Sequence, residues 1–67
     1  MTTEAQLLME FRNRMLPYEN LSAKDDVQSA VFMNGKDIIE KLQKNHGHSL
    51  VDSIGLLRAV LNGLNIK

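Results

Sequence analysis

The segment Ser49–Asn62 has the clearest helical pattern of apolar residues in this 67-residue chain. Its central stripe has spacings of four, three, four and three residues and consists of Leu50, Ile54, Leu57, Leu61 and Leu64. At about 100° per residue these positions share one face of an α-helix, which we expect to face the core. Leu56 and Val60 widen this face on one flank and Val51 on the other. We therefore expect more than one neighbouring element to cover the helix.

The sequence also marks the two ends of this helix. Ser49 can accept hydrogen bonds from the first free backbone N–H groups, and Asp52 stands three residues later, where a carboxylate suits the positive end of the helix dipole. Gly63 follows Asn62 and can take the left-handed conformation that ends many helices.

A first helix is predicted between Thr3 and Leu16. Thr3 and Gln6 have the spacing of a capping box, and Pro17 disfavours a helical conformation at the residue before it, so we expect residues 17–21 to be a connection. One side of this helix is apolar and consists of Leu7, Leu8, Phe11 and Met15. The other side carries residues that we expect to be solvated, namely Glu10, Arg12, Asn13 and Arg14.

A second and longer helix is predicted over Ala23–Asn45, with Ser22 and Asp25 as its start signal. Asn34-Gly35 leaves two interpretations open: one helix ends there and another begins, or a single helix passes through. The apolar positions on both sides of Gly35 form one continuous arc, made of Val27, Val31, Phe32, Ile38, Ile39 and Leu42. We favour the single helix, because a glycine inside a helix costs only about 1 kcal/mol relative to alanine.

Together these segments predict an all-α fold with three helices in one domain over residues 1–67. The turn at Asn45–His48 would return the last helix against the second as an antiparallel hairpin, with the first helix packed across the pair. A chain of this size buries only about 60% of the surface that its unfolded form exposes. Because the sequence has no cysteine to form a disulfide, we expect it to depend on a homodimer or on a partner protein.

The charge balance argues against several classes of partner. Eight basic and eight acidic residues leave no net charge to attract a phosphate backbone or an anionic membrane. The N-terminal sequence MTTEAQLLMEF lacks the basic region of a signal peptide, and no apolar run approaches the roughly 20 residues of a spanning helix. We expect a soluble, cytoplasmic protein with no nucleic acid, membrane or small-molecule substrate as its partner.

Two histidines are the only candidates for a metal site. His46 and His48 flank Gly47, but zinc takes three or four ligands, and neither Glu40 nor Asp52 is spaced to join them. We therefore expect solvated histidines in a turn, with no metal and no cofactor.

Asp52-Ser53-Ile54 is superficially similar to the attachment sequence of acyl carrier proteins. The resemblance ends there, because the sequence after Ser53 is too short for the two further helices of a carrier protein. A catalytic serine would also need a histidine base, a carboxylate that orients the base, and an enclosing pocket. We expect the protein not to be an enzyme.

A dimeric DNA-binding regulator of the helix-turn-helix type is the alternative. Ala30 stands five residues before Gly35, whereas the motif places its small residue four before the turn glycine. The following segment, KDIIEKLQKN, mixes carboxylates with its basic residues, which would repel phosphate. Contacts with the DNA backbone would then come from Lys36, Lys41 and Lys44.

The most informative feature is a surplus of apolar residues beyond what three short helices can cover. These residues are predicted to form a partner-binding or dimer interface and are Phe32, Met33, Ile39, Leu56 and Val60. Adaptable methionine side chains are common where a surface repacks on a partner. The sequence thus favours a small protein–protein interaction module, a homodimeric regulator or inhibitor of another macromolecule, of bacterial accessory or phage type.

Overall fold

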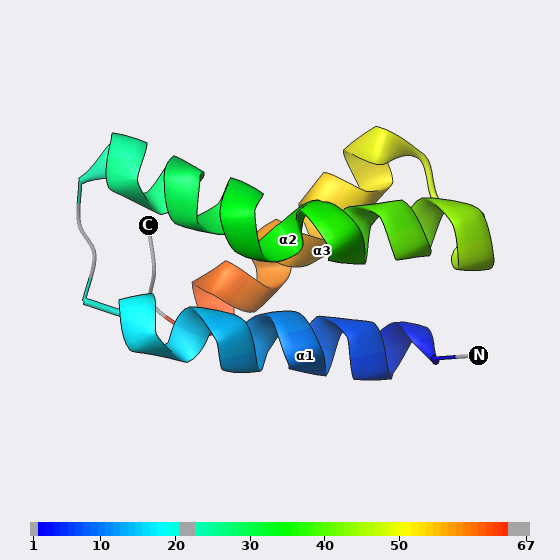
Figure 1. Ribbon diagram of the computed structural model, residues 1–67, viewed down its shortest axis with the longest axis horizontal. Helices are drawn as coiled ribbons and strands as arrows, with labels where there is room; N and C mark the ends of the chain where they lie inside the picture. The colour runs from blue at the N-terminus through cyan, green and yellow to red at the C-terminus, as the bar shows by residue number, and fades with distance from the viewer. Residues whose placement is uncertain (1, 21–22, 65–67) are drawn as a thin grey trace.

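The computed structural model describes residues 2–20 and 23–64, which form three α-helices and no strand. Helix α1 spans Glu4–Met15, α2 spans Lys24–His46 and α3 spans Leu50–Gly63, while a short 3₁₀ helix, η1, covers Leu16–Tyr18. Figure 1 shows α1 and α2 side by side in opposite directions, with α3 crossing behind them obliquely. All three helices contact one another. The predicted all-α fold of three helices, with the second the longest, is confirmed. The predicted hairpin of α2 and α3 with α1 packed across it is not confirmed in detail, because the antiparallel neighbour of α2 in Figure 1 is α1, and α3 is the helix that crosses the pair.

The sequence signals at both ends of α1 are confirmed. The backbone N–H of Gln6 donates to the Thr3 hydroxyl at 3.1 Å, and the backbone N–H of Thr3 donates to the Gln6 side chain at 2.9 Å. The α-helix ends at Met15, and Pro17 lies in η1, where its missing N–H leaves no bond unmade. The predicted apolar side faces the core, since Leu7, Phe11 and Met15 are fully buried.

Helix α2 is continuous through Asn34-Gly35, which confirms the interpretation as a single helix. Its N-cap is Ala23, whose side chain makes no capping bond, and the proposed start signal at Ser22 lies outside the described residues. Its end is set by Gly47, which has a φ of 69°. Only glycine takes this left-handed conformation without steric cost, so the helix stops there and the chain turns into α3.

Gly35 of α2 lies where side chains of α1 and α3 pack against it. A Cβ atom added at this position would lie 2.8 Å from Leu57 Cδ1 of α3 and 3.1 Å from Phe11 Cε1 of α1. The missing side chain therefore makes room for two fully buried residues on two different helices. This packing accounts for a glycine in the middle of a long helix, despite its low helix propensity.

The buried face of α3 differs from the predicted stripe. Leu57, Leu61 and Leu64 are buried, but Leu50 is 53% exposed and Ile54 is 38% exposed. Ser53 is fully buried in their place. Its hydroxyl donates to the backbone carbonyl of Ser49 at 2.9 Å, so the buried oxygen keeps a hydrogen-bond partner. The prediction that Leu50 and Ile54 face the core is wrong, because α3 is turned about its axis toward Ser53 where it packs.

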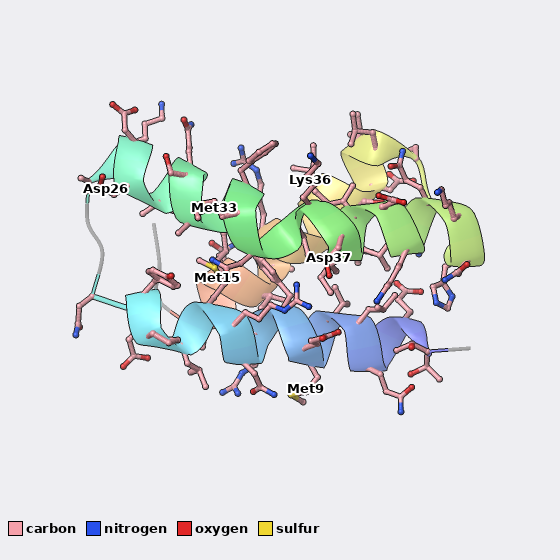
Figure 2. The ribbon with its side chains drawn as sticks, in the orientation of Figure 1. Met9, Met15, Asp26, Met33, Lys36 and Asp37 are labelled. Carbon is pink, nitrogen blue, oxygen red and sulfur yellow. The ribbon has the colours of Figure 1, made fainter. Side chains whose placement is uncertain are left out.

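Arg14 was predicted to be solvated, but its side chain is only partly exposed and joins α1 to α2. Its guanidinium donates to the backbone carbonyl of Asn34 at 2.9 Å, to Asp37 Oδ1 at 2.7 Å and to Glu10 Oε1 at 2.9 Å. Figure 2 shows Asp37 on the side of α2 that faces α1. The hydrogen bond from Arg14 lowers the pKa of Asp37 below its usual value, and the same bond raises the pKa of Arg14.

The two histidines of the turn contact the beginning of α1. His46 Nε2 lies 2.9 Å from the backbone oxygen of Thr2, and His48 Nε2 lies 3.1 Å from Glu4 Oε2. Both rings are only partly exposed. The expectation of solvated turn histidines therefore holds only in part, because each ring, although partly exposed, also contacts the N-terminal end of the described chain.

Candidate partner-binding groove

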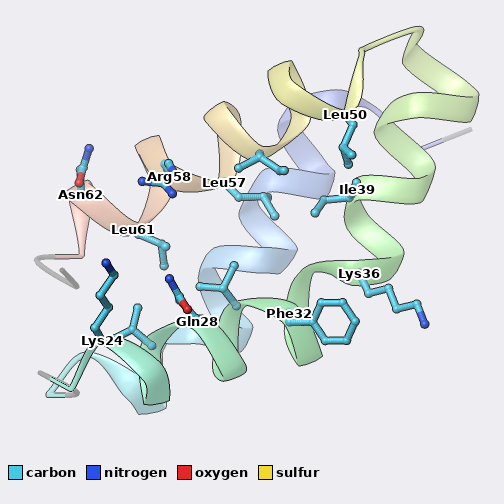
Figure 3. A pocket seen from close by; sticks show the side chains of 13 residues that line it. Lys24, Gln28, Phe32, Lys36, Ile39, Leu50, Leu57, Arg58, Leu61 and Asn62 are labelled. Carbon is cyan, nitrogen blue, oxygen red and sulfur yellow. The ribbon is translucent and has the colours of Figure 1, made fainter.

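A groove of about 660 Å³ runs between α2 and α3 (Figure 3). Its α2 wall spans Lys24 to Ile39 and its α3 wall spans Leu50 to Asn62. Thirteen residues line it, namely Lys24, Val27, Gln28, Val31, Phe32, Lys36, Ile39, Leu50, Ile54, Leu57, Arg58, Leu61 and Asn62. The groove therefore belongs to the two helices that carry most of the apolar surplus.

The walls of the groove are apolar and uncovered. Phe32 on α2 is 65% exposed, and Leu50 and Ile54 line the groove from α3 with about half and more than a third of their surfaces exposed. Leu57 and Leu61 are buried beneath them as part of the core. Large apolar side chains that share one concave surface mark binding sites more often than apolar residues scattered singly.

Both walls of the groove contribute cations. Lys24 and Lys36 come from α2 and Arg58 comes from α3. Among the residues that the structure describes, no Asp or Glu lines the groove. The ammonium of Lys36 lies 5.7 Å from the centroid of the Phe32 ring, within the range of a cation–π contact. The groove therefore combines an apolar floor with a basic rim, although the chain as a whole has no net charge.

The predicted interface residues fall into three groups. Phe32 and Ile39 line the groove. Met33 is 80% exposed but lies on a different face of α2, outside the groove. Leu56 and Val60 are partly buried and pack against the core. The structure thus brings two of the predicted residues together and separates the other three from them.

Sequence reasoning missed four important residues of the groove. Leu50 and Ile54 were assigned to the core because they share a helical stripe with Leu57, and nothing in that pattern reveals how α3 is turned against its neighbours. Lys24 and Arg58 were not predicted as site residues, because each is an isolated cation in the sequence. Only the juxtaposition of α2 and α3 places them around one groove.

The remaining candidates for chemistry are accounted for by local structure. The Ser53 hydroxyl is buried and bonded to the backbone, so it is not accessible for attachment of a carrier group. His46 and His48 contact different groups. Within residues 2–20 and 23–64, no three His, Asp or Glu side chains come close enough to share a metal ion.

Two other observations bear on the class of protein. The unbroken α2 has no turn at Gly35, so the helix-turn-helix arrangement considered for that segment is absent. None of the helices in the described part of the chain combines the length and apolar character needed to cross a membrane. No protein-family model matches the sequence, and no curated protein and no solved structure matches it either.

Proposed function

We propose that this protein is a small, non-enzymatic protein–protein interaction module that binds another protein in the groove between α2 and α3. The observation that carries the proposal is the exposure of Phe32, Leu50 and Ile54 on facing walls of one groove. Burial of apolar surface contributes about 25 cal/mol per Å², so covering these side chains favours association. By occupying part of its partner's surface, so small a protein would act as a regulator or inhibitor.

A second copy of the chain is a poorer occupant of the groove. In a twofold dimer formed groove to groove, the cations Lys24, Lys36 and Arg58 of one copy would face those of the other, and like charges at an interface oppose binding. The homodimer predicted from the sequence would use another surface, and exposed Met33 is available for it. Sedimentation equilibrium at micromolar concentration tests this prediction, and a folded, strictly monomeric species would contradict it.

Site-specific photo-crosslinking in the native host tests the groove as the binding surface. A benzoylphenylalanine residue would replace Phe32 or Ile54 in the groove, and Arg12, exposed on α1, would provide the control position. We expect one discrete adduct with a different protein from both groove positions and none from the control. Absence of groove adducts, or adducts formed only between two copies of this chain, would contradict the proposal.

DNA binding is the second candidate function, because three cations gather at one groove. Against it, a phosphate backbone offers nothing apolar to cover Phe32 and Ile54, and the chain has no net positive charge. An electrophoretic mobility shift with random-sequence DNA at low salt separates the two. No shift is expected, and salt-sensitive binding would reverse the order of the two candidates.

A further inference from the structure

We infer that the groove between α2 and α3 accepts an acidic amphipathic helix, which places an apolar stripe between Phe32 and Ile54 and carboxylates against the basic rim. This inference rests on the proposed function and names the chemistry of its partner. Three properties of the groove carry it: the nature of its walls, its length, and the sign of its charges.

The walls favour a helix over an extended strand or a small molecule. Both walls are helices, and within the described residues there is no strand whose edge could pair with an added strand. Small-ligand sites enclose most of the ligand surface, whereas Phe32 and Leu50 are more than half exposed. A helix laid between α2 and α3 would instead add a fourth helix to the three, burying an apolar face while its opposite face stays in water.

The length of the groove matches several turns of helix. Lys24 and Lys36 lie on the same wall of the groove, and twelve residues of helix separate them by about 18 Å. A partner helix of about three to four turns therefore spans the groove, and its apolar residues at i, i+4, i+7 and i+11 follow the exposed side chains.

The charges select an acidic partner. Lys24 of α2 and Arg58 of α3 lie near one end of the groove, and Lys36 lies farther along α2 (Figure 3), so carboxylates near both ends of the bound helix would each find a cation. A helix with basic flanks would meet like charges from both walls, with no groove carboxylate among the described residues to offset them. The contact between Lys36 and the Phe32 ring already holds one cation beside the largest apolar side chain of the groove.

The test uses three fluorescein-labelled synthetic peptides that have the same leucines at i, i+4, i+7 and i+11. The positions that flank this stripe are all glutamate in the first peptide, glutamine in the second and lysine in the third. Fluorescence anisotropy with the full chain measures their affinities. One exposed ion pair changes an equilibrium constant by about 1.4-fold to fivefold, so three predict a preference on the order of tenfold for the glutamate peptide over the glutamine peptide. This preference should shrink as salt is added.

Variants connect the preference to the groove. Lys36→Glu combined with Arg58→Glu should abolish the preference for the glutamate peptide. Arg12→Glu combined with Lys41→Glu changes the net charge equally, at exposed positions outside the groove, and should leave the preference intact. Ile54→Asp should weaken binding of the glutamate peptide at least tenfold, with circular dichroism confirming that each variant is folded.

Four results would overturn the inference: no binding of the glutamate peptide, equal binding of all three peptides, equal effects of the two double variants, or binding that Ile54→Asp leaves unchanged. Random-sequence DNA that displaces the bound glutamate peptide in a manner dependent on Lys36 and Arg58 would also overturn it, because phosphate would then be the preferred anion. The proposed function is tested separately by photo-crosslinking. Groove adducts in the host, together with equal peptide affinities, would retain the interaction module and reject only the acidic partner.

Discussion

Replacement of Gly35 by alanine should reverse the usual effect of that substitution in a helix. Alanine is favoured over glycine by about 1 kcal/mol inside a helix. At Gly35, however, the new methyl group would lie 2.8 Å from Leu57 Cδ1 and 3.1 Å from Phe11 Cε1. Both side chains are fully buried and packed against the core, so neither can turn into solvent to relieve the overlap.

Gly55 provides the matched control. It lies within α3, and a Cβ added there would have no neighbour within 4 Å, so Gly55→Ala should raise the free energy of unfolding by about 1 kcal/mol. Overpacking a core costs about 1–3 kcal/mol, which exceeds the gain of about 1 kcal/mol from helix propensity. Gly35→Ala should therefore have a free energy of unfolding about 1 kcal/mol lower than that of the wild type. The two variants should therefore differ by about 2 kcal/mol, or by roughly 10 °C in melting temperature for a domain of this size.

Urea unfolding followed by circular dichroism at 222 nm measures this difference. The wild type and both variants should unfold with similar slopes against urea concentration, so that the midpoints report stability alone. If Gly35→Ala proves as stable as Gly55→Ala, the close approach of α1, α2 and α3 at Gly35 is not a constraint, and the explanation given for this glycine fails.

Three further predictions concern the bond between α1 and α2 and the groove. Arg14→Ala should lower the free energy of unfolding by about 1 kcal/mol, because it removes hydrogen bonds from a partly exposed side chain to a second helix. Arg12→Ala, on the exposed side of α1, should change the free energy of unfolding by less than about 0.5 kcal/mol. Urea unfolding of both variants measures the difference. Because the pKa of Asp37 is lower in the folded protein than its ordinary value of 3.8, its contribution to stability is fully present above that value and is lost as pH falls through the lowered pKa. The stability difference between the wild type and Asp37→Asn should therefore shrink as the pH of the unfolding experiment is lowered below about 3.8, and a constant difference would contradict this cause. Phe32→Ser should change the free energy of unfolding by less than about 0.5 kcal/mol while abolishing peptide binding. Leu57→Ala, in the core, should lower the free energy of unfolding by about 2–5 kcal/mol. A large loss of stability in Phe32→Ser would show that Phe32 is a core residue.

The helices themselves could be predicted from the sequence because their signals are local. The capping box of Thr3 and Gln6, the stop at Pro17 and the N-cap Ser49 each act within a few residues of the chain. The continuity of α2 through Gly35 was also readable, because the phase of an apolar arc is a property of one helix alone.

The groove, in contrast, was decided by the tertiary structure. An apolar stripe tells which residues are available for burial, but Ser53 is buried and Leu50 exposed because of how α3 is turned against α1 and α2. Likewise, Arg14 of α1 donates a hydrogen bond to Asp37 of α2, and Lys36 and Arg58 line the same groove from different helices. Such pairings depend on the angle and rotation at which helices pack against one another. Both arise from the combined contacts of all three helices, so they cannot be predicted from the apolar period of any single helix.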